Sequence, residues 1–338
     1  MNTFIRLFQK IFFVFLILTI ALEAQSETSN ISIKPGAFGR MGFGARGIGM
    51  GNAMSAVIYG NIASYYNPAL SPFQNGNSFQ TSYSFLSLDR SLNFLSFTKN
   101  FEFGKKKDES GNEKPRSVAG LSIGLINAGV GDIQERDNQG NVTGDISTSE
   151  NMAFLGLSTR FSEKVSIGLT IKFFYYKLYE DITSTGLGFD VGAIYLLNNN
   201  ITFSFLFSDI KSEYKWDSNP IYGANGSSPD EKFPLRKTFG VSYKFDNPDL
   251  IVSAEIENSN AETTFVRFGV EYNIYPGLFV RGGLDKWNLS NSDFPARPSA
   301  GFSYFYTVDS FKLGVDYAFV IEPYSSSDQH IVGLTVNF

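Results

Sequence analysis

Apolar and polar residues alternate along most of the chain after residue 78. In 164–178 the apolar side chains of Val165, Ile167 and Leu169 are separated by Ser166 and Gly168. Strict alternation over this length is typical of a β-strand with one apolar and one polar face. The pattern recurs in fourteen segments: 79–88, 91–102, 117–126, 150–161, 164–178, 184–196, 200–210, 235–245, 249–257, 263–273, 277–286, 297–306, 310–321 and 328–338.

The lengths of the connections alternate as well. A strand that crosses a membrane takes about 9–11 residues, and exported barrels have an even strand number, short periplasmic turns and longer external loops. Counted back from the C-terminus, the periplasmic turns lie near 162–163, 197–199, 246–248, 274–276 and 307–309. The longest connections, 127–149, 211–234 and 287–296, then lie outside. The exception is 103–116, a charged segment expected to be a mobile periplasmic loop.

Composition favours a membrane barrel over a soluble β-sandwich or propeller. Charged residues make up 18% of the chain and aromatic residues 16%, with a mean hydropathy of -0.08. A soluble β-protein would carry more charge on its polar faces, which here are mostly Ser, Thr, Gly and Asn. The sequence therefore predicts an all-β fold, a transmembrane antiparallel β-barrel of fourteen strands over residues 79–338, with apolar faces toward lipid.

The N-terminus has the pattern of an export signal. Arg6 and Lys10 precede an apolar run over 11–22, and the small residue Ala24 follows it. The run is too short to span a bilayer as a helix, so we expect a signal peptide over 1–24 rather than an uncleaved anchor. Export of a barrel implies the bacterial outer membrane, with outer-membrane lipid and the barrel-assembly machinery as partners. The terminal Phe338 is the expected barrel signal.

Charge and composition exclude several kinds of function. The chain has 28 Lys and Arg against 33 Asp and Glu, a net charge of -5, which argues against nucleic-acid binding. It has no cysteine and one histidine, His330, so a metal site, a cofactor and a catalytic triad are not expected. An acidic stretch over 132–145 could hold calcium, but it lacks the EF-hand order, and a solvated external hairpin is favoured.

Residues 25–78 do not alternate and contain seven closely spaced glycines between 36 and 51. A phosphate-binding loop is excluded, because the sequence has no GxxxxGK[ST] motif and no surrounding βα unit. Glycines in tight turns would also explain the cluster, but we favour a compact plug folded inside the barrel, where small residues allow close packing. Asn67-Pro68 is expected to form a turn just before the first strand.

Two blocks in this segment resemble the N-terminal signature of the PorV/PorQ family, which belongs to the wider group of FadL-like outer-membrane proteins. The blocks are GARGIGMGNAMSAV over 44–57 and ASYYNPAL over 63–70. The matching positions are Gly44, Ala45, Arg46, Gly49, Met50, Gly51, Tyr66, Asn67, Pro68 and Ala69. The resemblance implies a fourteen-stranded barrel with an N-terminal hatch.

The resemblance leaves two functions open. Relatives include partners of the type IX secretion machinery, which implies a barrel that binds secreted proteins or secretion components at its external loops. Other relatives are channels for hydrophobic solutes, which implies passage of a hydrophobic ligand through the lumen. Aromatic residues expected on the external loops suit either function: Tyr214, Trp216, Tyr222, Trp287 and Phe294.

A ladder of charges is predicted on the inner face of the barrel. Its members are Glu255, Arg267, Glu271, Arg281 and Asp285, with Glu257 beside them. Pairing through the turn at 274–278 places Glu271 opposite Arg281 and Arg267 opposite Asp285. The acids could also suggest paired catalytic carboxylates, but no Ser–His pair accompanies them. We expect the ladder to be where the plug docks, with Arg46 as a partner.

Overall fold

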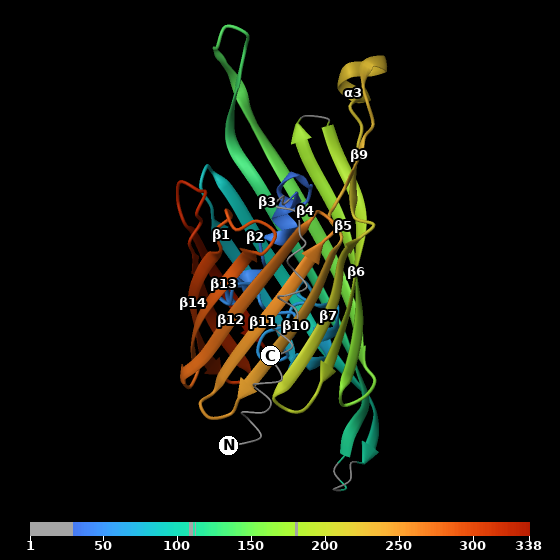
Figure 1. Ribbon diagram of the computed structural model, residues 1–338, viewed down its shortest axis with the longest axis vertical. Helices are drawn as coiled ribbons and strands as arrows, with labels where there is room; N and C mark the ends of the chain where they lie inside the picture. The colour runs from blue at the N-terminus through green and yellow to red at the C-terminus, as the bar shows by residue number, and fades with distance from the viewer. Residues whose placement is uncertain (1–29, 108–110, 112, 180–181) are drawn as a thin grey trace.

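The computed structural model describes residues 30–107, 111, 113–179 and 182–338. In this part of the chain fourteen strands close into the antiparallel barrel that the alternation predicts (Figure 1). Neighbouring strands follow one another along the chain, except that β10 comes directly after β7. The seam lies between β1 and β16, where the terminal Phe338 exchanges backbone hydrogen bonds with Asn77 at 2.8 and 3.0 Å. The predicted signal peptide lies outside the described residues.

The strands have the following bounds: β1 (Asn77–Phe85), β2 (Arg90–Lys107), β3 (Glu113–Arg136), β4 (Val142–Arg160), β5 (Val165–Tyr179), β6 (Ile182–Leu196), β7 (Ile201–Ile210), β10 (Arg236–Phe245), β11 (Leu250–Ser259), β12 (Thr263–Tyr275), β13 (Leu278–Asn288), β14 (Arg297–Val308), β15 (Phe311–Val320) and β16 (Gln329–Asn337). Two short strands, β8 (Glu213–Trp216) and β9 (Asp230–Lys232), lie outside the barrel wall.

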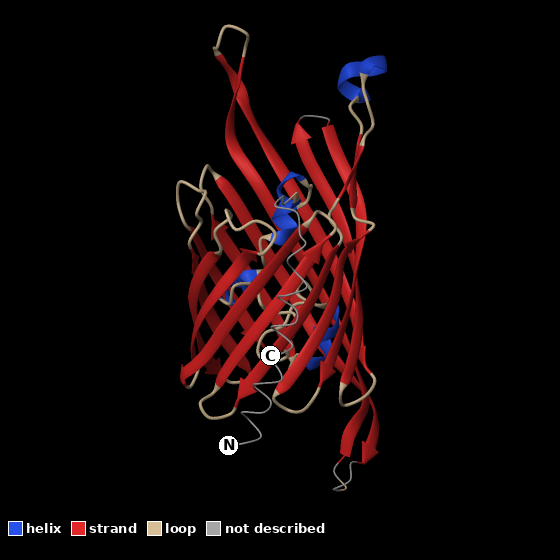
Figure 2. Ribbon diagram, viewed as in Figure 1, coloured by secondary structure: helices blue, strands red, loops and turns tan. Residues whose placement is uncertain are grey.

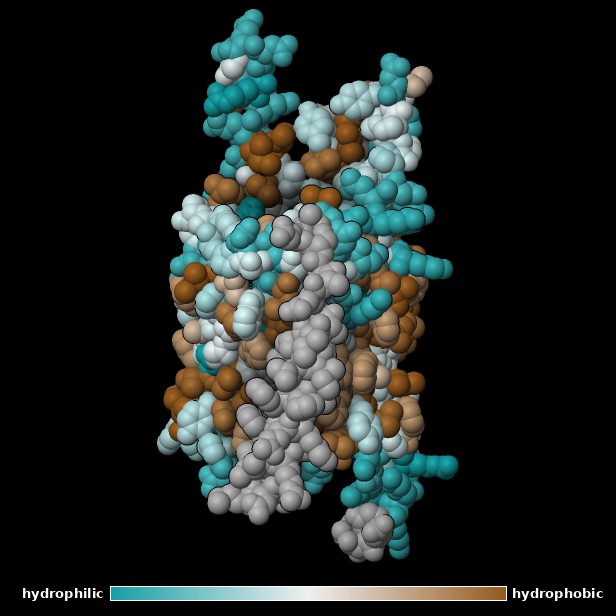
Figure 3. Space-filling model, in the orientation of Figure 1, coloured by the Kyte–Doolittle hydropathy of each residue, from teal (hydrophilic) through white to brown (hydrophobic). Residues whose placement is uncertain are grey.

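Burial follows the alternation strand by strand. On β7, Phe205 is 51% exposed whereas its neighbour Ser204 is fully buried. The exposed side chains form an apolar band around the middle of the molecule, with hydrophilic residues at both ends (Figure 3). The core therefore lies inside the barrel, and the outer face is suited to lipid. Among the described residues, no helix is both long and apolar enough to cross a membrane.

Two predicted loops are in fact strand. β2 and β3 continue as paired strands through 103–107 and 113–116, beyond the periplasmic end, so the loop expected over these residues is wrong. Residues 108–110 and 112 of this connection lie outside the described residues. Most of 127–149 also belongs to β3 and β4, which leave only 137–141 between them. β3 has 24 residues, more than twice the number that a membrane crossing needs, and it therefore projects at both ends (Figure 1).

The connection 211–234 forms an external arm. β8 pairs with β9 and with the upper part of β6, so the arm continues the wall upward. Beyond these strands the arm carries the short helix α3 (Asn219–Tyr222) and the 3₁₀ helix η4 (Gly223–Asn225). Periodicity could not reveal β8 and β9, because strands of four and three residues show no alternation to measure.

The described N-terminal residues 30–76, called the lumenal segment below, run inside the barrel (Figure 2). The segment contains η1 (Ile31–Ile33), η2 (Ala37–Arg40), α2 (Gly44–Gly49) and η3 (Pro68–Phe73). It starts at the external end, where Asn30 N donates to Ala261 O at 3.1 Å in the β11–β12 turn. It then descends to η3, which packs against β2–β6, and enters β1 at the periplasmic end. The described chain therefore begins at the external end of the lumen, and only the start of β1 and the end of β16 lie at the periplasmic end.

Candidate functional site

The five ladder residues lie together on the inner face of β11, β12 and β13. Glu271 stands opposite Arg281, whose Nε donates to Glu271 Oε2 at 2.6 Å. Arg267 Nε donates to Asp285 Oδ1 at 2.8 Å, and its Nη1 lies 3.8 Å from Glu255 Oε2. None of the five is more than 7% exposed. The ladder has three carboxylates and two guanidinium groups, so one negative charge needs a partner from outside the ladder, because a buried charge is stable only when it is paired.

Arg46 of α2 joins this ladder from the lumenal segment. Its Nε and Nη2 donate to the two carboxylate oxygens of Glu271 at 2.8 and 2.7 Å. A third donor, Nη1, reaches the backbone oxygen of Asn61 at 2.9 Å within the segment. Two-pronged Arg–carboxylate pairs are the strongest of the charge-assisted hydrogen bonds, so Arg46 is the main ionic tie between segment and wall.

Further hydrogen bonds fix the middle of the segment. Glu255 Oε1 accepts from Ser55 N at 2.5 Å, and Asp285 Oδ2 accepts from Asn52 Nδ2 at 3.0 Å. Tyr66 holds the segment together, because its hydroxyl accepts from Phe43 N and donates to Asn52 Oδ1 at 2.9 and 2.8 Å.

The Asn67-Pro68 pair forms a helix cap rather than a simple turn. Asn67 Oδ1 accepts from Ala69 N at 2.9 Å, which satisfies a free donor at the start of η3. Pro68 occupies the first position of η3, where its missing N–H costs nothing. Asn67 and Ala69 are fully buried, so this block of the motif anchors the lower part of the lumenal segment.

Glycines of the barrel wall create most of the space in which the lumenal segment contacts the wall. An added Cβ would come within 3.0 Å of lumenal-segment atoms at seven inward-facing positions on seven strands. These positions are Gly120, Gly156, Gly168, Gly192, Gly240, Gly269 and Gly283. The sequence showed them only as members of polar strand faces, because contact with a segment far away along the chain leaves no local pattern.

The glycines of the motif have different roles. Gly44 and Gly51 have positive φ angles of 68° and 60°, which favour glycine. Gly51 also lies against the backbone of Gly283 and Leu284, without space for a Cβ. Gly49 has an ordinary helical backbone, and a Cβ there would meet the Ala318 Cβ at a normal 3.5 Å. Ala45 and Met50, the apolar residues of this block, are both buried.

This difference predicts opposite outcomes for two neighbouring alanine substitutions. Gly51→Ala is expected to destabilise the folded barrel by about 1–3 kcal/mol through overpacking. Gly49→Ala is expected to leave stability unchanged or to raise it by less than about 1 kcal/mol, because alanine favours helix. The measurement is the temperature at which the unboiled, fast-migrating band on a denaturing gel converts to the unfolded one. Equal midpoints for both variants would contradict the close contact at Gly51.

The charge ladder continues around the lumen beyond the residues that the sequence indicated. Lys172 Nζ on β5 lies 2.7 Å from Asp190 and 2.9 Å from Asp209. Arg236 bridges Asp209 and Glu257 at 2.8 and 3.1 Å, and Glu257 then meets Arg267 at 3.2 Å. Asp285 also lies 3.6 Å from Arg297 of β14, so eight of the fourteen barrel strands, from β5 through β14, carry linked opposite charges on their inner face. Lys172 and Asp190 lie on the polar faces of the predicted strands 164–178 and 184–196. These two charges were the signal in the sequence that could have indicated the longer ladder.

The inner face of β2–β5 is apolar toward the external end of the barrel. Side chains of β2–β5 turn inward here, although the wall below is polar: Leu92, Phe94, Ile126, Met152, Phe154 and Phe174. Phe43 of the lumenal segment packs on Phe94 and Phe154, with ring centroids 5.0 and 5.8 Å away. Tyr214 and Phe233 of the external arm cover the cluster and are buried. We call this group the lumenal aromatic cluster.

The five aromatic residues expected on external loops therefore lie in different surroundings. Tyr214 and Trp216 point into the lumenal aromatic cluster, where Trp216 packs on Tyr176 with centroids 5.2 Å apart. Trp287 lies on β13 and is 49% exposed on the outer face. Tyr222, in the arm, and Phe294, in the β13–β14 loop, are exposed.

Two small cavities lie beside the described part of the lumenal segment. One cavity of about 40 Å³ lies between Tyr65, Lys172 and Arg236, and another of about 20 Å³ lies within the segment around Tyr66. A cavity of this size admits water but no larger solute. Passage of a solute through this part of the lumen would therefore require the segment to move.

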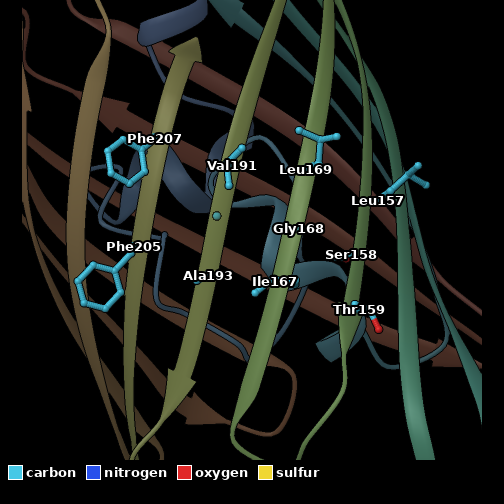
Figure 4. Close-up of a pocket in the computed structure, with 11 residues that line it drawn as sticks. Leu157, Ser158, Thr159, Ile167, Gly168, Leu169, Val191, Ala193, Phe205 and Phe207 are labelled. Carbon is cyan, nitrogen blue, oxygen red and sulfur yellow. The ribbon is translucent and has the colours of Figure 1, made fainter.

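A larger hollow of about 600 Å³ lies on the outer face across β4–β7 (Figure 4). Its rim is formed by outward-facing side chains such as Leu169, Phe205 and Phe207. Its floor includes Gly168 and Gly192, whose inner sides contact the start of η3. The hollow belongs to the lipid-facing surface, and the strand backbone separates it from the lumen.

The acidic stretch 132–145 is a hairpin end in the structure. Asp137 closes it, because its Oδ1 accepts from Gln139 N and Asn141 N at 2.8 and 2.9 Å. The side chain of Asn141 donates to the other carboxylate oxygen at 2.9 Å. Within the residues that the structure describes, no group of three or more His, Asp or Glu side chains is placed to hold a metal ion.

Comparison with solved structures identifies the fold. The Pseudomonas putida toluene transporter TodX superposes with a TM-score of 0.56 at 13% identity, covering 87% of this chain and 96% of TodX. The monoaromatic hydrocarbon channel CymD gives 0.59 at 14% identity, covering 88% and 98%. A Pseudomonas aeruginosa FadL homologue gives 0.51 at 12% identity, with the same coverage as CymD. No protein-family model and no curated protein matches the sequence.

The fold is thus that of the FadL- and TodX-type channels of the outer membrane. The fourteen strands, the lipid-suited outer face and these neighbours place the chain in the bacterial outer membrane. At this level of identity the likeness concerns the fold alone, because one fold hosts many functions.

Proposed function

We propose that this barrel is an outer-membrane channel that binds a hydrophobic small molecule in the lumenal aromatic cluster. The observation that carries the proposal is the inward orientation of Phe94, Phe154 and Phe174 on strands whose neighbouring residues face lipid. A channel for hydrophilic solutes has a polar interior, so aromatic side chains pointing inward favour an apolar ligand. The structural neighbours include a toluene transporter and a monoaromatic hydrocarbon channel, which supports this alternative over a secretion role.

In the proposed mechanism the ligand enters from outside beneath the external arm. Tyr214 and Phe233 lie over the cluster and pack on Phe174, so the arm must shift to admit a ligand. Passage further down then requires the lumenal segment to move, because the cavities beside it are too small. Arg46 and its contact with Glu271 would keep the pathway closed until that movement.

The two tryptophans provide a direct test with a brominated monoaromatic compound as the probe. Trp216 lies in the cluster, whereas Trp287 lies on the lipid side. In a Trp287→Phe variant, 4-bromotoluene is expected to quench the remaining fluorescence of Trp216 saturably, because a site fills. In the matched Trp216→Phe variant, quenching of Trp287 is expected to rise linearly, because the probe only partitions into the detergent or lipid.

A polar substitution in the cluster completes this experiment. Phe154→Asp in the Trp287→Phe background is expected to remove the saturable quenching, because a carboxylate in an apolar site disfavours a hydrocarbon. Heat-modifiable migration of the variant would show that the barrel is still folded. Linear quenching of Trp216 in the parent background, indistinguishable from that of Trp287, would refute the ligand site.

As a second candidate we propose the PorV/PorQ-type role, in which external projections bind an exported protein. Its support is the arm beyond β8 and β9, which carries Ile221 and Tyr222 exposed on α3 (Figure 1). Deletion of 217–229 would then abolish capture of secretion components from solubilised outer membranes. Capture by the deletion variant at the parental level, or no capture by the parent, would count against this role.

A further inference from the structure

A separate pocket of about 210 Å³ opens at the external end, beside the lumenal aromatic cluster, against which its lining residues Met41 and Leu86 pack. The β1–β2 turn and the β15–β16 loop form its sides, and Ser87 Oγ and Ser325 Oγ are hydrogen bonded at 2.5 Å between them. β13, β14 and β16 contribute further side chains, and Met41 of the lumenal segment contributes one more. The polar residues that line it are Ser87, Arg90, Lys286, Arg297, Glu322, Ser325, Ser327 and Gln329.

Two buried donors in this pocket lack partners. Gln329 is 1% exposed, and its Nε2 forms no hydrogen bond within the described part of the chain. Arg297 is 9% exposed, and its Nε is likewise unpaired there. Leaving a buried donor unsatisfied costs about 1–3 kcal/mol, so two of them in one pocket require an explanation. Both atoms have almost no surface open to the pocket, so an acceptor bound there would reach them only after a small shift of the two side chains.

The charge of the pocket indicates the kind of acceptor. Three cations line it, Arg90, Lys286 and Arg297, against the single carboxylate of Glu322. That carboxylate is already paired with Arg297 Nη2, and Arg297 Nη1 lies 3.6 Å from Asp285 Oδ2 behind the pocket. Lys286 forms no ion pair among the described residues, and its backbone has a φ of 54° at an irregularity between β12 and β13. The pocket therefore has positive charge and N–H donors that the protein itself does not use.

We propose that this pocket binds a phosphate group. Arg90 and Lys286 bring positive charge to the pocket from β2 and β13, and serine hydroxyls lie beside them in the turn and the loop. Arg297 Nε and Gln329 Nε2 lie just behind this surface, on β14 and β16. A tetrahedral oxyanion with several acceptor oxygens uses such a set more fully than a planar carboxylate does. The group can belong to a free solute or to a lipid headgroup at the cell surface. This site does not depend on the hydrophobic-ligand proposal.

Calorimetric titration of the purified full-length barrel in detergent at low ionic strength tests the proposal. Inorganic phosphate is the first probe, and dihexanoylphosphatidate below its micelle concentration is the second. Lys286→Gln is expected to weaken binding of the active probe about tenfold, the usual effect of losing one charge-assisted contact. Lys237→Gln is the matched control, because this exposed lysine at the start of β10 alternates with inward-facing Arg236 and points away from the lumen.

A second variant distinguishes loss of the binding site from loss of the fold. Gln329→Glu places a carboxylate beside Arg297 and is expected to abolish phosphate binding, because it occupies the donors that phosphate would use. The temperature at which its folded band converts to the unfolded band should equal or exceed that of the parent. Loss of binding would then come from the new carboxylate and not from misfolding. Binding of inorganic phosphate indicates a free solute, and binding of the phosphatidate alone indicates a lipid. The proposal is overturned if neither probe binds, or if Lys286→Gln and Gln329→Glu bind as tightly as the parent.

Discussion

Deletion of residues 36–65 is expected to raise the conductance of the barrel in planar bilayers by at least about tenfold. Eight strands enclose a lumen that side chains can fill, and sixteen leave an aqueous channel, so fourteen leave room for ion flow once the lumenal segment is removed. The strands should still assemble, because their ladders close through β1 and β16 without any contribution from the segment. Conductance and heat-modifiable migration are measured on the same preparation.

A point substitution refines this result. Arg46→Ala keeps the segment but removes its two-pronged contact with Glu271, so we expect brief openings rather than a permanently open pore. Arg136→Ala, on the external β3–β4 hairpin, removes a cation without touching the segment and serves as the control. If the deletion variant is folded and conducts no more than the parent, the idea that this segment closes the pore is wrong.

A protease site inserted immediately before Asn30 is expected to be cut on intact cells. Asn30 N and Nδ2 donate to Ala261 O and Glu262 Oε2, at 3.1 and 2.8 Å, in a turn at the external end. The chain then passes down through the lumen and reaches β1 at the periplasmic end. The effect is all or none, because the barrel separates the two compartments.

Two further insertions calibrate this experiment. A site at Gly226 in the external arm should be cut on intact cells, and a site in the β10–β11 turn at Asn247 should be cut only after the envelope is opened. Cleavage before Asn30 that follows the Asn247 pattern would mean that the segment runs through the lumen in the opposite direction. Cleavage of the Asn247 site alone on intact cells would reverse the orientation of the whole barrel.

Alternation predicted the strands well because each strand has only two environments, lipid and lumen. Val165, Ile167 and Leu169 face lipid, and they lie two residues apart because side chains of a strand alternate between its two faces. The same reasoning placed Glu271 beside Arg281, since a short turn determines which residues face each other. It could not connect Lys172 with Asp209, because a bulge in β7 and a long separation along the chain intervene.

The lumenal aromatic cluster escaped prediction for a related reason. On β4, both Met152 and Phe154 face inward, while the outward positions between and beyond them are also largely apolar. A strand that is apolar on both faces loses the contrast on which the alternation depends. The external arm and Phe43 cover the inner face of β4, and lipid covers its outer face. No residue near Met152 in the sequence indicates which group covers which face.

The seven wall glycines couple the strength of the barrel to its contents. A glycine in the middle of a strand costs roughly 0.5–1 kcal/mol relative to alanine, so these strands are individually weakened where they receive the lumenal segment. Contacts with Pro68, Ser55 and Met50 compensate at those same points. Withdrawal of the segment would therefore do two things together: open a route through the lumen and soften the wall around it. Permeability and rigidity of this protein would then both depend on one equilibrium, and substitutions that weaken the contacts of the segment should raise conductance and lower the melting temperature together.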